Sequence, residues 1–428
     1  MLRRPIALAT FVLLAQHAAA IDFSPVTTPI GEYVASKPRV PGAGLLIVDF
    51  NGQTLHEQYW GKFDRQSVVR IGSATKWLSG AAVMSVVDDG LIGLDTRADA
   101  VLPEFVDHPA AGMTVRQMFS HTASAPGGSS WVNDRTVTLA EAVAGIAANE
   151  TWLAPSGETF HYGGVSMHVA GRATEVAAGV PWESLFDDRL LTPLGITDTD
   201  FDGLGPTTNP RIAGGARSSV DSYARFLRML ADGGVFEGDR VLSQASVDAM
   251  LSDQTGDAVL DSAPPTVDEY LGYGVGSWVF RRNDAGEPVE WGSPGLFGAV
   301  PWIDTENRYF GIFLIDDLLQ NVDGLVDDVR AFTRDALSLA GDYNLDGVVD
   351  EADLDTWRDD FSRTDGSRAD GNGDGVVDAA DYVVWRDAVR TTVVTTPEPS
   401  TAAMALMLVA LAGLDLKPHR LTRRRVGA

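Results

Sequence analysis

Residues 70–80 read RIGSATKWLSG and place a serine and a lysine three positions apart, after a short β-branched run and a glycine. Residues three apart share one face of a helix, so the Lys76 ammonium can lie beside the Ser73 hydroxyl. In the plainer interpretation, Ser73 is a helix N-cap and Lys76 is a solvated lysine. A single S-x-x-K pattern does not separate the two, so the rest of the chain must decide.

The overall composition limits the kinds of protein that this chain can be. Its 428 residues suffice for two or three domains, and 45% hydrophobic residues can fill a core. The 33 basic and 59 acidic side chains leave a net charge of −26, which argues against nucleic-acid binding because that binding relies on phosphate neutralisation. The absence of cysteine excludes disulfides, cysteine nucleophiles and thiolate metal sites.

Both ends of the chain have the composition of targeting segments. Residues 1–20 combine two early arginines, an apolar stretch and a run of small residues, which predicts a secretory signal peptide cleaved before Ile21. Residues 393–428 contain Pro-Glu-Pro, then an apolar run at 401–414 and an arginine cluster. That run is shorter than the roughly 20 residues that span a bilayer comfortably.

The C-terminal layout resembles the bacterial PEP-CTERM sorting signal, whose hydrophobic tail is recognised and removed during export to the surface. The alternative is a short anchor that the protein retains. Both interpretations predict an exported protein, at the cell surface or outside the cell, that meets the membrane only through this tail.

Between these ends, the sequence predicts one large domain at 21–340 and a small repeated unit at 341–392. The segments expected to form strands or helices in the large domain are a hairpin at 43–61, helices at 73–90 and 219–232, strands within 270–282, 287–293 and 308–316, and a closing helix at 318–339. Strands at both ends with helices between them predict an α/β (α+β) fold. In it, one antiparallel sheet is flanked by helices and carries a helical subdomain.

An activated serine in such a protein needs a base. None of the seven histidines accompanies a G-x-S-x-G elbow. His121 is the best histidine candidate, and the alternative is a structural histidine that bonds nearby backbone. A lysine can act as the base only if burial or a nearby cation lets its ammonium lose the proton near neutral pH. Lys76, one turn inside an apolar helix, is placed for that.

Four blocks of sequence, in order, resemble a known family. They are SATK at 73–76, TVRQMFSHTASAPG at 114–127, PSGETFHYGGVSMHVAGRATEVAAG at 155–179 and NPRIAGGARSSVDSYARFLRMLADGG at 209–234. They resemble the serine β-lactamase and penicillin-binding superfamily, in its class C β-lactamase-like branch. The resemblance covers most of residues 30–338.

This resemblance implies roles for three side chains. Ser73 would be the acylated nucleophile, and Lys76 would help to deprotonate it. Tyr162 matches the tyrosine of the Tyr-x-Asn motif, a phenol that acts as general base and acid with the lysine. The Ser73 backbone N–H would form half of the oxyanion hole at a helix N-terminus. Catalysis would need no metal.

Two positions depart from the family pattern. Gly164 replaces the asparagine of Tyr-x-Asn, and the third motif is not cleanly present in EWGSPGLFGAVPWID. The rival alignments for that motif are Trp291-Gly292 and Ser293-Pro294-Gly295. Esterase members of the branch tend to carry Trp-Gly here and to lack the asparagine, so the resemblance favours a small ester substrate. The alternatives are a β-lactam, a D-Ala-D-Ala-type amide, or a catalytically silent binding protein.

Two acidic loops in the repeated unit follow the pattern D-x-N-x-D-G-x5-D, which supplies the oxygen ligands of a Ca²⁺ ion. The first loop offers Asp342, Asn344, Asp346, the Val348 carbonyl, Asp350 and Asp353, and the second offers Asp370, Asn372, Asp374, the Val376 carbonyl, Asp378 and Asp381. Each loop leads into a helix with Trp-Arg-Asp. The sequence therefore predicts two structural calcium sites in an all-α, EF-hand-like pair.

The repeated unit resembles a type I dockerin, in which aspartate at loop position 12 is usual. Positions 10 and 11 are Glu-Ala and Ala-Ala here, not the usual Ser-Thr pair. A cohesin-like protein partner is therefore one interpretation, and a calcium-stiffened stalk near the cell surface is the other.

Overall fold

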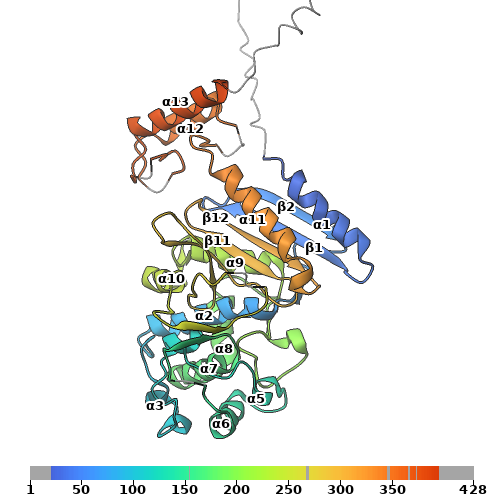
Figure 1. Cartoon of the computed structure of the whole chain (residues 1–428), viewed down its shortest axis with the longest axis vertical. Helices are drawn as coiled ribbons and strands as arrows, with labels where there is room; N and C mark the ends of the chain where they lie inside the picture. The colour runs from blue at the N-terminus through green and yellow to red at the C-terminus, as the bar shows by residue number, and fades with distance from the viewer. Residues whose placement is uncertain are drawn as a thin grey trace, which may run out of the picture. The chain divides into compact units, whose positions relative to one another are not determined.

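The structure is a computed structural model that describes residues 21–394, except 154, 267–268, 345–347, 365–366 and 373. Its contacts separate a unit at Asp22–Asp335 from one that includes the chain from Ala336 onward (Figure 1). The expected signal peptide at 1–20 and all but the first two residues of the expected tail at 393–428 lie outside the described residues. No helix within the described ranges is long and apolar enough to cross a membrane.

Six antiparallel strands form the main sheet, in the order β2-β1-β12-β11-β10-β9. The strands are β1 (Gly42–Asp49), β2 (Thr54–Gly61), β9 (Trp278–Arg282), β10 (Pro288–Gly292), β11 (Val300–Asp304) and β12 (Tyr309–Ile315). The two ends of the domain meet where β1 pairs with β12, with Leu46 opposite Ile312. The antiparallel sheet and the hairpin between β1 and β2 confirm the sequence prediction.

Helices cover both faces of this sheet (Figure 1). On one face, Gly31 of α1 (Ser24–Ser36) lies against Trp60 of β2. On the other, α9 (Val220–Ala231) packs on β1, β11 and β12, where Val220 reaches Gly44. The expected closing helix at 318–339 is two elements, a 3₁₀ turn at Leu319–Asn321 and α11 (Asp323–Leu337).

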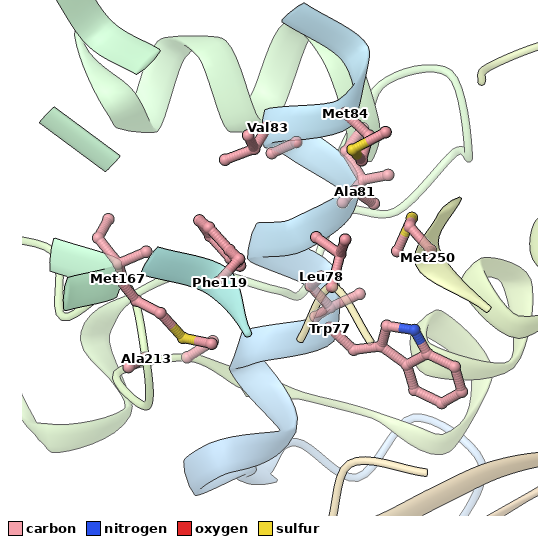
Figure 2. Packing of buried hydrophobic residues seen from close by; sticks show 14 of the residues in the cluster. Trp77, Leu78, Ala81, Val83, Met84, Phe119, Met167, Ala213 and Met250 are labelled. Atoms are coloured by element: carbon pink, nitrogen blue, oxygen red, sulfur yellow. The ribbon is translucent and has the colours of Figure 1, made fainter. Parts of the chain in front are cut away.

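The helical subdomain contains the buried helix α2 (Thr75–Asp88), which packs against α7 (Val165–Ala178), α8 (Trp182–Phe186) with a π turn at Asp187–Leu191, and α10 (Gln244–Met250). The other elements are α3 (Ala98–Val101), α4 (Val115–Phe119) and α6 (Leu139–Asn149), which pack on α7, and α5 (Ser130–Asn133), which packs on α6. Every α2 residue from Thr75 to Val86 is buried, as expected for a helix that is mostly apolar all round. Figure 2 shows this packing, with Phe119, Met167 and Met250 around α2.

Short strand pairs connect the subdomain to the sheet. The antiparallel pair β3 (Val69–Arg70) and β5 (Arg217–Ser218) holds residues 211–216 beside the start of α2. The remaining pairs are β4 (Thr159–His161) with β8 (Val259–Ser262), which is parallel, and β6 (Val235–Phe236) with β7 (Asp239–Arg240).

Within its described residues, the C-terminal unit contains the helices α12 (Glu351–Asp360) and α13 (Ala379–Val394). Its small core consists of Tyr343, Ala369 and Val377, with the two tryptophans packed against it. The indole of Trp357 donates to the Asp378 carbonyl at 2.8 Å, and that of Trp385 donates to the Asp350 carbonyl at 2.6 Å. Each repeat is thus fastened to the loop of the other.

Candidate active site

Ser73 lies on a 3₁₀ turn (Gly72–Ala74) that leads directly into α2. The predicted helix at 73–90 therefore begins two residues late, because Gly72 has φ +52° and turns the chain before the helix starts. The Thr75 hydroxyl fixes this turn, since it donates to the Gly72 carbonyl at 2.7 Å and accepts the Ala216 N–H at 3.1 Å. Ser73 is the one residue of 71–86 that is not fully buried.

Lys76 is 3% exposed, and its Nζ lies 2.9 Å from the Ser73 Oγ. The same amine donates to the Ala213 carbonyl at 2.6 Å. Burial, with the nearby charge of Arg211 as the second cause, lowers the pKa of Lys76 to about 7. The lysine that the sequence places beside the serine can therefore exist as a free amine near neutral pH.

Tyr162 follows β4 and completes the group predicted from sequence. Its ring centroid is 4.7 Å from the Lys76 Nζ, and the ring stacks on Trp278 at 5.1 Å. Burial raises the pKa of the Tyr162 phenol to about 12, against hydrogen bonds with Ser73 and Trp278 that lower it. The phenol stays protonated near neutral pH and is available to relay a proton at Ser73.

His121 lies behind Tyr162, with the two ring centroids 4.5 Å apart. The ring is buried, and its Nδ1 is 3.4 Å from the Gly163 N–H that donates to it. Burial, with the Lys76 charge second, holds the pKa of His121 well below its usual value. A neutral imidazole behind the tyrosine fits the structural histidine of the two interpretations considered above.

The rival third-motif segments have different surroundings. Trp291 is fully buried within β10, and a side chain at Gly292 would overlap the Phe280 ring. The Ser293 Oγ, in contrast, lies 3.1 Å from the Ser73 carbonyl oxygen, and a side chain at Gly295 would overlap the Ile71 carbonyl. The structure therefore brings the Ser293-Pro294-Gly295 segment, and not Trp291-Gly292, against the turn that carries the nucleophile.

The predicted strand at 270–282 begins only at Trp278 because residues 275–277 pack on the backbone of α2. Gly276 has φ +89°, and a side chain there would overlap the Lys76 carbonyl. The Ser293 Oγ is also 3.0 Å from the Gly276 carbonyl oxygen. This close approach positions Ser293 over the start of α2.

Sequence reasoning missed three contributors to the site. The Leu296 backbone N lies 2.9 Å from where a Cβ on Gly72 would stand, and within the described residues its N–H has no hydrogen-bond partner. Together with the Ser73 N–H, it could donate a hydrogen bond to an oxyanion. The other two, Arg211 and Ala213, lie in the 209–234 block. The family resemblance included this block but implied no role for either residue.

The C-terminal loops contain the residues predicted to bind calcium, although Asp346 lies outside the described residues. The carboxylates of Asp353 and Asp381, at position 12 of each loop, are buried and accept backbone N–H groups of their own loop at 2.7–3.1 Å. No three acidic or histidine side chains among the described residues converge on a metal position. Calcium binding therefore stays a prediction, supported by an oxygen-only donor set.

The site combines a buried amine of lowered pKa, a phenol of raised pKa and a partly exposed hydroxyl. Environments that push the pKa values of neighbouring groups apart assign the acid and base roles in an active site. These environments suit Lys76 to the role of base and Tyr162 to that of proton relay. The arrangement suits nucleophilic attack by Ser73 on a carbonyl carbon.

Comparison with known proteins identifies the family of the chain. The family model described as Beta-lactamase matches residues 26–335. Penicillin-binding protein 4 of Amycolatopsis lactamdurans is 29% identical over 257 residues, which are 51% of this chain and 66% of that protein, just under two thirds of its length. Esterase EstB of Burkholderia gladioli is 27% identical over 189 residues, covering 38% of this chain and 47% of EstB.

A solved β-lactamase-like structure from Bacteroides dorei is 30% identical, with a TM-score of 0.62. It covers 69% of this chain, and the chain covers 90% of it. The family match spans well over half of the residues, and Ser73, Lys76 and Tyr162 lie within it. The chain belongs to the β-lactamase family of serine hydrolases, which has penicillin-binding and esterase relatives.

Proposed function

We propose that this protein hydrolyses short-chain carboxylic esters through an acyl-enzyme on Ser73. The observation that carries the proposal is the buried Lys76 amine, 2.9 Å from the Ser73 hydroxyl and with a pKa of about 7. A serine hydroxyl becomes a nucleophile when an adjacent base can take its proton. This pair supplies both groups from one helical turn.

In acylation, the free amine of Lys76 takes the Ser73 proton while Oγ bonds to the ester carbonyl carbon. The resulting oxyanion faces the N–H groups of Ser73 and Leu296. The bond from the carbonyl carbon to the alcohol oxygen then breaks, and the leaving alkoxide receives the proton from Lys76 through the Tyr162 phenol. The products of this half-reaction are the alcohol and the acyl-serine.

In deacylation, a water molecule attacks the acyl carbon and gives its proton to the same Lys76 and Tyr162 pair. The bond between the carbonyl carbon and Oγ breaks, the carboxylic acid leaves, and Ser73 regains its proton. No metal or cofactor enters either step of this proposal.

Two polar groups that would bind an amide or β-lactam substrate are missing from the site, and their absence favours esters. Gly164 offers no side chain in place of the motif asparagine, and Pro294 has no backbone N–H to donate. The relative named Esterase EstB supports the same choice, whereas the penicillin-binding relative keeps β-lactam and D-Ala-D-Ala-type substrates as the second candidates. A catalytically silent binding protein would have no need of a buried lysine amine with a lowered pKa beside Ser73.

The proposal is tested by turnover of p-nitrophenyl esters, nitrocefin and a D-Ala-D-Ala peptide, with Ser73→Ala as the control. We expect short-chain esters to be hydrolysed fastest and Ser73→Ala to be inactive yet folded. Faster turnover of nitrocefin or the peptide would replace the esterase assignment by the matching alternative. Failure of all three substrates would favour the binding protein.

We further propose that the C-terminal pair binds two Ca²⁺ ions and that the protein is exported. The alternating oxygen donors in both loops support calcium, and the composition of residues 1–20 and 393–428 supports export and surface sorting. A cohesin-like partner is one role for the pair, and a stiffened stalk is the other. Binding of purified cohesin modules to the calcium-loaded protein separates these two roles.

A further inference from the structure

His121 has a backbone conformation that residues other than glycine rarely adopt. It directly follows Ser120, the C-cap of α4, and its φ of +60° lies in the left-handed region. The Thr122 N–H donates to the Gln117 carbonyl at 2.9 Å, the bond that closes a Schellman turn at the end of a helix. Glycine is the usual residue at this position because it has no Cβ. A histidine strains the backbone here, so the presence of its side chain requires an explanation.

Both backbone N–H groups that flank Tyr162 donate to His121. The His161 N–H donates to the His121 carbonyl at 2.9 Å, and the Gly163 N–H donates to the His121 Nδ1, with 3.4 Å between the two nitrogens. The first bond uses the backbone of His121 and the second uses its imidazole. One residue therefore fastens the chain on each side of Tyr162.

The imidazole of His121 also packs on the phenol ring. The centroids of the His121 and Tyr162 rings are 4.5 Å apart, with an angle of 48° between the ring planes. Trp278 stacks on the same tyrosine at 5.1 Å, and both neighbours of the phenol ring are buried. The ring of Tyr162 is therefore held by packing, in addition to the hydrogen bonds on either side of it.

The hydrogen bond from Gly163 determines which nitrogen of the imidazole carries the proton. A backbone N–H can only donate, so Nδ1 is the acceptor and the ring proton lies on Nε2. Burial, with the Lys76 charge second, holds the pKa of His121 well below its usual value, so Nδ1 keeps its lone pair near neutral pH. Within the described residues, the Nε2 has no hydrogen-bond partner. The hydrogen bonding of this ring is thus directed at the backbone beside Tyr162.

We propose that His121 is a positioning residue that holds the Tyr162 phenol where it can pass a proton to the leaving alcohol. The inference rests on the proposed ester hydrolysis, in which Lys76 and Tyr162 move the Ser73 proton to the leaving group. His121 itself exchanges no proton in the reaction. Its carbonyl, its Nδ1 and its ring fix residues 161–163, and a displacement of about 1 Å at such a group can lower a rate by roughly 100-fold.

The test compares two esters of the same acid, ethyl butyrate and p-nitrophenyl butyrate. Ethoxide needs a proton in order to leave, whereas p-nitrophenolate leaves as the anion, so only the first depends strongly on a placed proton donor. His121→Gly relieves the backbone and removes the imidazole. We expect it to lower kcat/KM for ethyl butyrate by about 10- to 100-fold, and that for p-nitrophenyl butyrate by a much smaller factor. Damage to the fold would lower both values alike.

Three further variants separate the interactions. Asparagine tolerates the left-handed conformation and its Oδ1 can accept the Gly163 N–H, so His121→Asn should recover most of the ethyl butyrate activity. His121→Leu has a similar shape but no acceptor, and should lose that activity. Ser124→Gly is the matched control, because Ser124 lies in the same loop with φ +55° while its hydroxyl contacts Pro155 and Thr159. It should leave the ratio of the two esters unchanged. The asparagine and leucine pair carries the test if the glycine variant does not fold.

Tyr162→Phe shows whether His121 acts through the phenol. In that background, His121→Gly should change the rate with ethyl butyrate little, because the group that it positions is already gone. Equal loss of both esters in His121→Gly, the same loss with and without the Tyr162 hydroxyl, or no recovery in His121→Asn would overturn the proposal.

Failure of the esterase assignment can be recognised separately. If the wild type hydrolyses neither ester, crystal structures of the wild type, His121→Asn and His121→Gly report on the placement of Tyr162 alone. A phenol ring that moves only in His121→Gly supports the positioning role without turnover. A ring that stays in place in all three proteins contradicts it.

Discussion

At the scale of single residues, the site is organised by one buried amine. Lys76 is buried, and its amine lies 2.6 Å from the Ala213 carbonyl oxygen and 2.9 Å from the Ser73 hydroxyl. Its pKa is lowered to about 7, while burial raises that of Tyr162 to about 12. Near pH 7, the lysine can therefore accept a proton and the tyrosine can donate one, which is the division of labour that acyl transfer needs.

The first prediction concerns the pH dependence of acylation. Lys76 is the base only as a free amine, so the rate should rise with pH below about 7 and level off above it. Stopped-flow measurement of p-nitrophenol release between pH 5 and 10 checks this, with Tyr162→Phe as a comparison that keeps the midpoint but lowers the plateau. A midpoint near 10 would show that the lysine is not buried in the working enzyme.

The second prediction concerns stability. The folded pKa of Lys76 lies below its unfolded value of 10.5, so the unfolded chain binds more protons between pH 7 and 10.5. This lysine destabilises the fold fully below pH 7, and the effect fades as pH rises through that window. Lys76→Met should abolish turnover yet raise Tm, by more at pH 6 than at pH 10. Scanning calorimetry of both proteins checks this, and a Tm gain independent of pH would contradict it.

At the scale of elements, glycines let two loops pack closely against α2. Gly276 brings residues 275–277 onto the Lys76 carbonyl, and Gly295 brings the third-motif segment onto Ile71. Gly72 turns the chain just before α2, and Ser73 on this turn is partly exposed while its neighbours are buried. The geometry of the site therefore depends on these three glycines, where a larger residue would not fit or would strain the backbone.

The third prediction uses two glycines of similar backbone conformation. Gly276 has φ +89° and no room for a Cβ, while Gly286 has φ +82° and nothing within 4 Å. Gly286→Ala should cost roughly 1 kcal/mol of unfolding free energy for its backbone alone. Gly276→Ala should cost about 1–3 kcal/mol more from overlap, and should also reduce turnover. Urea denaturation of both variants checks this; equal costs would mean that the loop does not press on α2.

The elements differ in how far the sequence could predict them. The hairpin around Asn51-Gly52 and the helix that contains Lys76 follow from local patterns, and both are found. Strand β11 was not predicted because Pro301 in its middle is atypical of a central strand, although all residues of the strand are buried. Residues 270–277 look like a strand but bend away where glycines approach α2.

The residues of the site also differ in whether a local sequence pattern could predict them. Ser73, Lys76 and Tyr162 have local motifs, so their positions could be read from the chain. Leu296 contributes a backbone N–H that any residue but proline possesses, so its type carries no signal. Ala213 and Ala216 lie against the start of α2 beside the β3–β5 pair, and such long-range pairing has no local signature.

At the scale of the whole molecule, the chain joins a catalytic domain to a small unit of a different kind. The C-terminal unit is rich in carboxylates and has a core of few residues, Tyr343, Ala369 and Val377. A core of that size provides little stability by itself, so an ion that binds the folded loops would add most of it. The unit at Asp22–Asp335 has its own large hydrophobic core.

The fourth prediction follows from that difference. Calorimetric titration of the full-length protein with Ca²⁺ should show two sites, and Asp381→Asn should remove one of them. Chelation should lower the melting temperature of the C-terminal unit and leave ester hydrolysis unchanged. Absence of calcium-dependent heat would contradict the metal assignment, and loss of hydrolysis on chelation would contradict the independence of the two units.

The measurement that tests the central claim most directly is the intact mass of the protein after brief exposure to a short-chain p-nitrophenyl ester. If Lys76 activates Ser73, the mass should rise by one acyl group, and peptide mapping should place that group on Ser73. Ser73→Ala should show no gain while it remains folded. Wild-type protein that is folded but gains no mass, even in the millisecond range by rapid quench, would contradict the account.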